Sequence, residues 1–197
     1  TENLLHYLPA STYSILQAGC HEQSPVTLDD FYPYLQYCLW NPAHPLTEYL
    51  DINTDLANRI RTLYDPALSC SEFLDILVNK SYTKTRILRS LLHILLDIRQ
   101  EQMLMQRNSN SMHYARLLAF RQESAPLLKH INAHSSIPVI NKVSSGLRQL
   151  KGADPLGASL LEQDIASAHL YELAAGRHYM RPPVNEFRAG IFIGPHS

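Results

Sequence analysis

The stretch from Lys80 to Ile98 reads Lys-Ser-Tyr-Thr-Lys-Thr-Arg-Ile-Leu-Arg-Ser-Leu-Leu-His-Ile-Leu-Leu-Asp-Ile, and it joins a basic loop to an apolar segment. Thr83 is a suitable N-cap residue for a helix that begins here. Apolar residues then recur every three or four positions, as on one face of an amphipathic helix. They are Ile87, Leu88, Leu91, Leu92, Leu95 and Ile98. The stretch therefore predicts a long helix that reaches about Ile98.

Shorter helices are predicted on the N-terminal side, each with a capping residue and a stop signal. Ser11 or Thr12 can cap a helix that ends near Gly19. A second helix starts at Asp29 and Asp30 and stops at Asn41-Pro42, a third runs from Asn53 or Thr54 through Leu63, and a fourth runs from Ser69 or Ser71 through Val78. The first part of the chain is thus expected to be helical.

The C-terminal side has a different pattern. The polar segment from Gln100 to Ser111 predicts a loop or linker. Residues 114–120 and 137–140 predict strands on either side of a helix over 124–133, which fits a small parallel βαβ unit. A last helix is expected over 160–174, and the Pro- and Gly-containing segment after it is expected to be irregular.

These elements predict a mainly α fold, a helical bundle with a small βαβ appendage whose strands lie near 114–120 and 137–140. The expected division is a helical domain over 1–100, a linker or loop over 101–111, a small α/β unit plus terminal helix over 112–175, and an irregular tail over 176–197. Because Thr1 is not a methionine and the first residues read like the end of an element, a fragment without its N-terminal portion is expected.

Composition limits the class of protein. With 197 residues, 45% of them hydrophobic, the chain can bury a sizeable core. Its three cysteines are too few and too scattered for a disulfide scaffold, which favours a reducing compartment. The sequence shows no signal peptide and no apolar run that approaches 18 residues. We therefore expect a soluble, cytoplasmic protein with no membrane partner.

Positive charge is concentrated in the middle of the chain. Residues 1–58 contain no Lys or Arg, whereas fourteen of the seventeen Lys and Arg residues lie within 59–151. Such an excess can form an electrostatic footprint for a polyanion. The alternative is a solvated surface with unevenly distributed charge.

No enzyme signature is present. The sequence has no GxxxxGK[ST] phosphate-binding loop, no GxGxxG and no GxSxG. His130 and His134 would share a helix face, but no Glu or Cys lies at a zinc-compatible spacing. We therefore predict no catalytic residues and no metal ligands in this chain.

The basic cluster is the main candidate site. Lys80 and Lys84 flank the predicted helix start, where backbone N–H groups attract phosphates, and Arg86 and Arg89 project from neighbouring positions of that helix. A lysine in the first turn opposes the helix dipole, which is a reason to look for a function. Tyr82 could stack on an unpaired base.

A structural interpretation of the same residues is equally open. Arg86 and Arg89 could form ion pairs with acids of the same chain, such as Asp75 or Asp97. Tyr82 would then be a core residue.

The segment from Asn79 to Arg89 resembles the Thr-Lys-Arg-Tyr-Thr-x-Thr-Arg-x-x-Arg signature of the bacterial tRNA(Met) cytidine acetate ligases, which are HIGH-type nucleotidyltransferase-like enzymes. The resemblance extends from about Leu8 to Tyr171. Residues 56–60 are similar to a Leu-Glu-x-Arg-Ile segment, and residues 114–120 and 137–142 to the family's Tyr-Ile-Arg-x-Leu-Gly-Phe and Leu-Pro-x-x-x-Lys patterns; Asp164, Ala166, Ser167 and Tyr171 approximate a further pattern. Ser81 and Ala57 depart from the signature by replacing charged residues.

The resemblance implies an enzyme that activates acetate with ATP as acetyl-adenylate and transfers it to the wobble cytidine of elongator tRNA(Met), giving N4-acetylcytidine. In that family an N-terminal nucleotidyltransferase domain with an Asn-Pro-Phe-His-x-Gly-His motif holds ATP, and this sequence contains no such motif. The resemblance therefore implies only the C-terminal helical half, with no cofactor in this chain and with ATP and Mg in a missing N-terminal domain of the same protein.

The leading hypothesis is that this chain is the part of such a ligase that positions tRNA. The enzyme would then be the longer parent protein. Its predicted nucleic-acid-binding residues are Lys80, Tyr82, Lys84, Arg86 and Arg89, followed by Arg59 and Arg61. The alternatives are a domain that braces the catalytic part or forms a homodimer without touching nucleic acid, and a related fold used for another adenylating modification.

Overall fold

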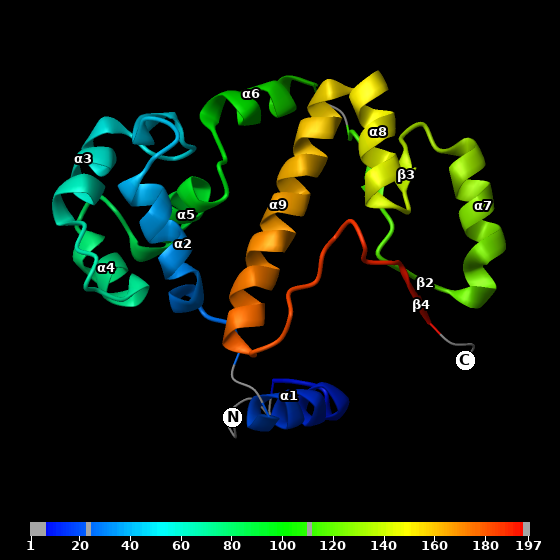
Figure 1. The fold of residues 1–197 in the computed structure, drawn as a ribbon, viewed down its shortest axis with the longest axis horizontal. Helices are drawn as coiled ribbons and strands as arrows, with labels where there is room; N and C mark the ends of the chain where they lie inside the picture. Colours follow the sequence, from blue (N-terminus) through cyan, green and yellow to red (C-terminus); the bar gives the residue numbers. More distant parts are fainter. Residues whose placement is uncertain (1–6, 23–24, 110–111, 195–197) are drawn as a thin grey trace.

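The computed structural model describes residues 7–22, 25–109 and 112–194, and Figure 1 shows two groups of elements on either side of the long helix α9 (Pro155–His178). The first group consists of helices α2 (Leu28–Trp40), α3 (Thr54–Leu63), α4 (Cys70–Leu77) and α5 (Lys84–Leu95), with a 3-10 turn, η2 (Leu46–Glu48). Helix α6 (Gln100–Ser109) leads from this group to the top of α9.

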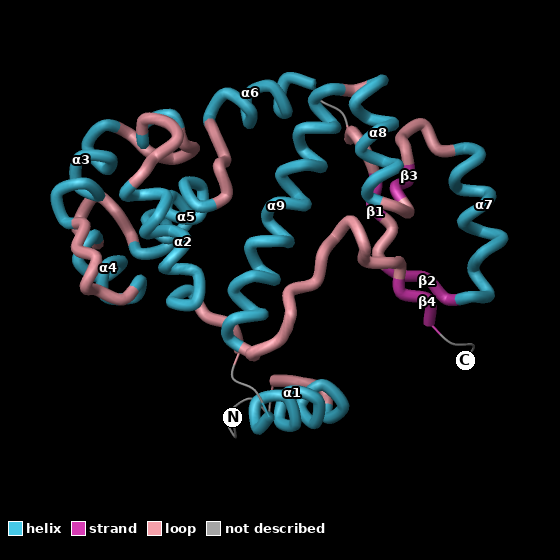
Figure 2. Tube along the Cα trace, in the orientation of Figure 1, coloured by secondary structure: helices cyan, strands magenta, loops and turns pink. Residues whose placement is uncertain are grey.

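The second group contains short strands and helices. They are β1 (Ala115–Arg116), β2 (Ala119–Arg121), the 3-10 turn η3 (Gln122–Ser124), α7 (Ala125–His134), β3 (Val139–Ile140), α8 (Val143–Ala153) and β4 (Phe192–Gly194). Figure 2 shows the strands on the side of α9 that faces away from α2–α5.

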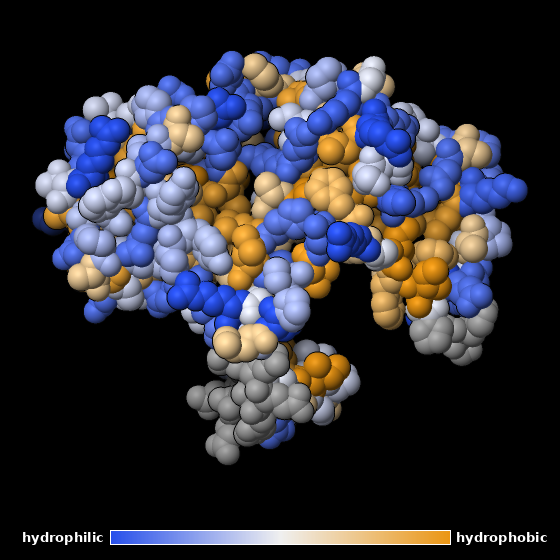
Figure 3. Space-filling model, in the orientation of Figure 1, coloured by the Kyte–Doolittle hydropathy of each residue, from blue (hydrophilic) through white to orange (hydrophobic). Residues whose placement is uncertain are grey.

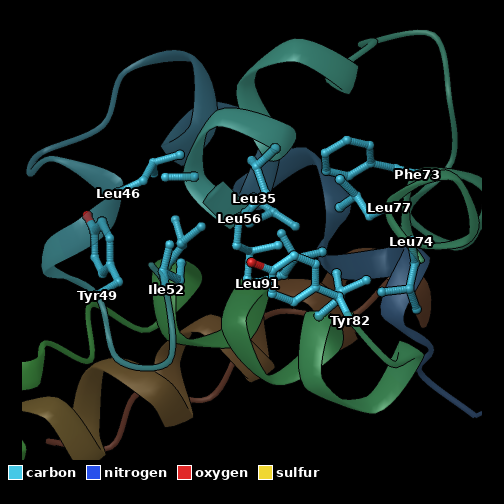
Figure 4. Close-up of a cluster of buried hydrophobic side chains, with 14 of the residues drawn as sticks. Leu35, Leu46, Tyr49, Ile52, Leu56, Phe73, Leu74, Leu77, Tyr82 and Leu91 are labelled. Atoms are coloured by element: carbon cyan, nitrogen blue, oxygen red, sulfur yellow. The ribbon is translucent and has the colours of Figure 1, made fainter. Parts of the chain in front are cut away.

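The first group encloses the larger hydrophobic core (Figure 4). Each helix contributes residues at helical spacing; on α5 these are Ile87, Leu91 and Ile94, and all three are at most 2% exposed. Phe73 of α4 and Leu56 of α3 are fully buried against them. The amphipathic pattern of 80–98 therefore has the packing role that the sequence predicts.

Local capping confirms where the predicted helices begin. The Asn53 side chain accepts a hydrogen bond from the backbone N–H of Leu56 at 2.9 Å, which caps α3. Ser69 and Glu72 form a capping box on α4, and the backbone N–H of Ser69 lowers the pKa of the Glu72 carboxyl. These local contacts define the N-terminal ends of α3 and α4, and Asp29 of α2 supports the start of α4 by accepting from the backbone N–H of Ser71 at 3.0 Å.

Helix α5 ends earlier than the sequence predicts, at Leu95 rather than Ile98. Asp97 has φ of 52°, a left-handed conformation that ends the helix. The backbone N–H of Leu50 then donates to the carbonyl oxygen of Ile98 at 2.9 Å, and Tyr49 pairs with Arg99 in an antiparallel bridge. Pairing with the 49–50 segment thus replaces the last helical turn.

The predicted fold class, a helical bundle with a βαβ appendage, is wrong. The structure is α/β, with two separate parallel sheets: β1 pairs with β3, and β2 pairs with β4. The segment expected to form one strand over 114–120 is divided into β1 and β2, which belong to different sheets. The parallel pairing of β1 with β3 is as predicted, but the second sheet depends on contact with residues 192–194, which no local pattern reveals.

Two segments predicted as irregular contain regular structure. In the predicted linker 101–111, residues through Ser109 belong to helix α6, and the last two positions lie outside the described residues. In the predicted tail 176–197, α9 continues to His178 and residues 192–194 form β4. The polar composition of α6 hides its helix because the helix buries no side chain completely.

A second hydrophobic core lies under α8 and α9. Its buried residues are Ile140, Val143, Leu150, Ala158, Leu161 and Ile165. Gly146 of α8 lets the helix approach β3, because a Cβ atom there would lie 2.5 Å from Cγ2 of Ile140. The division into domains at 101–111 stays a prediction, and the separation of the two cores supports it.

The face of the molecule that Figure 3 shows is partly apolar. Figure 3 shows hydrophobic side chains in the depression between the α2–α5 group and α9, where Phe31, Leu92 and Tyr171 help to line a cavity of about 380 Å³. Helix α1 (Ala10–Glu22) lies apart from the rest of the molecule in Figure 1, with Ile15 72% exposed. Within the described residues, no helix is both long and apolar enough to cross a membrane.

Candidate nucleic-acid interface

The loop before α5 is held by local hydrogen bonds. The side-chain oxygen of Asn79 accepts from the backbone N–H groups of Ser81 and Tyr82, both at 2.8 Å. Thr83 caps the helix by accepting from the backbone N–H of Arg86 at 3.4 Å. This loop therefore places Lys80 and the first turn of α5 in a defined conformation.

Tyr82 lies in the core, with 3% of its surface exposed. Its hydroxyl donates to the Asp55 carboxylate at 2.8 Å and lies 3.0 Å from the side-chain oxygen of Asn53. The ring is thus unavailable for stacking on a base in this structure. Tyr82 instead joins the loop before α5 to the start of α3, as the structural interpretation of this residue predicts.

Arg86 covers the outer face of that buried ring. Its guanidinium carbon lies 5.0 Å from the centroid of the Tyr82 ring, a cation–π distance. Arg86 forms no salt bridge within the described part of the chain. Its charge therefore stays available at the N-terminal turn of α5.

Two predicted cations are paired with acids. Nζ of Lys84 lies 2.5 Å from the Asp75 carboxylate, and Nε of Arg89 lies 2.6 Å from that of Asp51. All four side chains are at least 31% exposed, so solvent screens both pairs. The structural interpretation expected acids to pair with Arg86 and Arg89; the acid that pairs with Arg89, Asp51, is not one it named.

The two arginines of α3 differ sharply. Arg59 donates from Nε to the carbonyl oxygen of Leu77 and from Nη2 to that of Ile76, both at 2.8 Å. These carbonyls lie at the C-terminal end of α4, where no backbone N–H of the helix is available to donate to them. Arg61 is exposed, and among the described residues it has no hydrogen bond or ion pair.

The structure thus brings four of the seven predicted residues together at the start of α5: Lys80, Tyr82, Lys84 and Arg86. Arg89 lies one turn further along, and Arg59 and Arg61 lie on α3. Lys80, Arg86 and Arg61 keep unpaired charge within the described structure. A helix N-terminus with free cations is suited to bind phosphate.

Sequence reasoning missed a cavity at the junction of α6 and α9. It has a volume of about 430 Å³ and is lined by Ile98, Gln106, Met112, His113, Tyr114, Leu160, Gln163, Asp164 and Ser167. Beside it, Nδ1 of His113 donates to the Asp154 carboxylate at 2.6 Å, and the backbone N–H of Gly157 and this imidazole lower the pKa of Asp154. Three of its residues, Tyr114, Asp164 and Ser167, lie in segments that resemble the family, which is the only signal the sequence offers.

No group of three or more His, Cys, Asp or Glu side chains is arranged to hold a metal ion in the part of the chain that the structure describes. Unpaired cations and backbone N–H groups at a helix start can bind phosphate oxygens, which both a nucleotide and a nucleic acid present.

Comparison with known proteins defines the class. A family model described as HIGH Nucleotidyl Transferase matches residues 1–182, and the chain belongs to this family. Its relatives include the tRNA(Met) cytidine acetate ligase of Thermoanaerobacter sp. (strain X514), 29% identical over 188 residues, which are 92% of this chain and 45% of that protein. The Acetivibrio thermocellus protein of the same name is 30% identical over 172 residues, 87% of this chain and 41% of that protein. The chain thus spans less than half the length of these relatives.

The fold is also that of a solved protein. The crystal structure of Thermotoga maritima TmcAL bound with alpha-thio ATP superposes with a TM-score of 0.78 at 18% identity, over 99% of this chain and 51% of that one. Its apo form matches with the same score. This likeness supports the α/β fold class and confirms that the predicted helical bundle is wrong.

The comparisons confirm the predicted family and correct two other expectations. A resemblance limited to the C-terminal half is not supported, because the family match begins at residue 1. The placement of ATP in a missing domain is contradicted, because the nucleotidyl transferase match covers residues 1–182 of this chain. That placement depended on the absence of one short motif, which weighs less than a match over most of the chain.

Proposed function

We propose that this chain takes part in the ATP-dependent joining of acetate to the wobble cytidine of elongator tRNA(Met), which yields N4-acetylcytidine in the cytoplasm. Its membership of the nucleotidyl transferase family and its similarity to proteins named tRNA(Met) cytidine acetate ligase support this reaction. The chain itself contacts tRNA through the start of α5. The single observation that carries this contact is the unpaired charge of Arg86 in the first turn of α5, with exposed Lys80 in the loop that precedes it.

The geometry favours phosphate contacts over base readout. Cations and backbone N–H groups at a helix start bind phosphate oxygens without regard to sequence. Tyr82 is buried, so the base-stacking role expected from the sequence has no exposed ring to perform it. Lys80, Arg86 and Arg61 are therefore the preferred contacts, and Lys84 and Arg89 can join them only by weakening their pairs with Asp75 and Asp51.

The experiment is a salt titration of tRNA binding. Lys80→Glu combined with Arg86→Glu should weaken binding of elongator tRNA(Met) at least about tenfold at low salt and reduce the salt slope by about two. Lys129→Glu changes the charge of an exposed cation on α7 and is the matched control. Denaturant unfolding should be unchanged in the control, and the double variant should lose no more than about 1 kcal/mol, because Arg86→Glu removes the cation–π contact with Tyr82.

The second candidate function is a bracing role, in which the chain supports a further nucleotidyltransferase domain or forms a homodimer. If the double substitution lowers the melting temperature and leaves tRNA affinity alone, bracing is the better account. Sedimentation of the intact chain at several concentrations tests the dimer directly.

We also propose that this chain binds ATP. The family match and the similarity to the Thermotoga maritima protein bound with alpha-thio ATP support it. Calorimetric titration of the chain with ATP and Mg²⁺ tests the proposal, and the absence of measurable binding at millimolar ATP would contradict it.

A further inference from the structure

The cavity between α6 and α9, called here the α6–α9 pocket, has the size and polarity of a ligand site. Its volume of about 430 Å³ lies in the range of pockets that hold small molecules. Ile98, Met112 and Leu160 supply apolar walls, and Gln106, Tyr114 and Asp164 supply polar groups. A planar polar ring would therefore find both stacking surface and hydrogen-bonding partners.

Several polar groups of this pocket keep capacity for a ligand. The Asp164 side chain is 51% exposed, and the closest cation, Nη1 of Arg116, is 3.7 Å away. The same arginine is bound more closely by Glu186. Within the described structure, neither the Tyr114 hydroxyl nor the Gln106 side-chain amide has a hydrogen-bond partner.

Tyr114 is neutral and suited to donate. Burial raises the pKa of its hydroxyl, and the nearby Asp164 carboxylate adds to that effect. A phenol hydroxyl beside a carboxylate offers one donor and one strong acceptor to the same ligand. This pair matches a ligand that presents an amine next to an acceptor atom.

The pocket wall is rigid on the other side. Nδ1 of His113 donates to Asp154, and its Nε2 lies 3.1 Å from the Ser109 hydroxyl. Asp154 also caps α9 by accepting from the backbone N–H of Gly157 at 3.0 Å. A wall fixed before the ligand arrives loses little conformational freedom on binding.

We propose that the α6–α9 pocket receives a nucleobase that carries an exocyclic amine, with Asp164 accepting a hydrogen bond from that amine and Tyr114 or Gln106 donating to a ring acceptor. Cytosine and adenine share this pattern, whereas uracil presents a carbonyl oxygen where cytosine has its amine. The inference deepens the proposed function and depends on it for the source of the base, which is either the cytidine of tRNA or the adenine of ATP.

The test measures binding of cytidine, adenosine and uridine 5′-monophosphates to the intact chain by NMR. Either the cytidine or the adenosine nucleotide should bind at least about tenfold more tightly than the uridine nucleotide, because uracil would face the carboxylate with an acceptor. The preferred nucleotide identifies the source of the base. Asp164→Asn should remove most of this preference, and Leu160→Trp should fill the pocket and weaken binding of both amine-bearing nucleotides.

Glu162→Gln is the matched control, since this exposed carboxylate lies on the same helix and pairs with Lys151 outside the pocket. Equal binding of all three nucleotides, or a preference that survives Asp164→Asn in a folded variant, would overturn the inference. Thermal melts of each variant establish that it is folded, and Ser167→Leu serves in place of Leu160→Trp if the larger side chain prevents folding.

Failure of this inference and failure of the proposed function give different results. If Lys80→Glu with Arg86→Glu abolishes tRNA binding while no nucleotide shows Asp164-dependent binding, only the pocket assignment is wrong. If the pocket discriminates nucleotides but tRNA does not bind the chain, the pocket stands and the tRNA contact at α5 is wrong.

Discussion

Nε of Arg89 donates a hydrogen bond to the Asp51 carboxylate across 2.6 Å, although the two residues lie 38 positions apart. Asp51 has φ of 65°, a left-handed conformation that few residues other than glycine adopt. Its backbone oxygen lies 3.4 Å from the hydroxyl of buried Ser90, and the preceding carbonyl, that of Leu50, accepts from Nδ1 of His93 at 2.9 Å. The turn at Leu50 and Asp51 is thus held against α5 by these hydrogen bonds. The Asp51 carboxylate also partly neutralises Arg89, a cation of the candidate interface.

This pair allows a prediction in which loss of an acid strengthens binding. Asp51→Asn keeps a residue type that tolerates the left-handed conformation but removes the charge that holds Arg89. We expect tRNA to bind about two- to fivefold more tightly at low salt, because Arg89 gains freedom to meet phosphate. Fluorescence anisotropy with labelled tRNA measures this change, and weaker binding by a folded variant would exclude Arg89 from the interface.

Tyr82 should prove to be a structural residue. Tyr82→Phe removes the hydroxyl that donates to Asp55 at 2.8 Å and should lower the free energy of unfolding by about 1–3 kcal/mol. Denaturant unfolding measures the loss, and tRNA affinity of the folded variant should stay within about twofold of the unmodified protein. Tyr82→Leu removes the ring as well as the hydroxyl, so a large loss of tRNA affinity in folded Tyr82→Leu that Tyr82→Phe does not share would restore the stacking role.

Arg59 and Arg61 form a matched pair on one helix. Arg59→Ala leaves the carbonyl groups of Ile76 and Leu77 without their donors and should destabilise the fold by about 1–3 kcal/mol. Arg61→Ala should change stability by less than about 0.5 kcal/mol, since its side chain is exposed and unpaired within the described structure. The same two variants, assayed for tRNA binding, should show a reduced salt slope for Arg61→Ala alone.

Local signals predicted the helices of the first core well. Asn53, Ser69 and Thr83 cap α3, α4 and α5 as expected, because a capping side chain needs only backbone groups two or three residues away. The end of α5 was wrong because Ile98 pairs with Leu50, a contact across the chain. The second sheet was missed for the same reason, since β2 and β4 are separated by some seventy residues.

The candidate site was predicted as a set of cations but not as a set of contacts. The pairing of Lys84 with Asp75 and of Arg89 with Asp51 joins residues from different elements, so charge counting along the sequence cannot detect it. The burial of Tyr82 depends on the position of α3, which the sequence does not state. The α6–α9 pocket likewise forms only where α6 meets α9, and the polar pattern of α6 resembled a linker.

Two glycines of α8 should respond to substitution in opposite directions. Gly146→Ala would place a Cβ atom 2.5 Å from Cγ2 of Ile140 and should destabilise the fold by about 1–3 kcal/mol. Gly152→Ala meets no atom within 4 Å and should be neutral or stabilising by up to about 1 kcal/mol. Thermal unfolding of both variants measures the contrast, and equal effects would show that α8 does not lie close to β3.

The contact between His113 and Asp154 should make stability depend on pH. The backbone N–H of Gly157 and the imidazole of His113 lower the folded-state pKa of Asp154 below its ordinary value of 3.8. Because the folded state holds the proton of this carboxyl less tightly than the unfolded state, the contribution of Asp154 to the free energy of unfolding is fully present above pH 4 to 5. It is lost as pH falls through the lowered pKa.

Asp154→Asn keeps an N-cap residue but cannot titrate. The difference in unfolding free energy between the two proteins should therefore shrink as pH falls from 5 towards 2, as measured by urea unfolding. A difference that stays constant down to pH 2 would show that Asp154 is not stabilised in its ionised form.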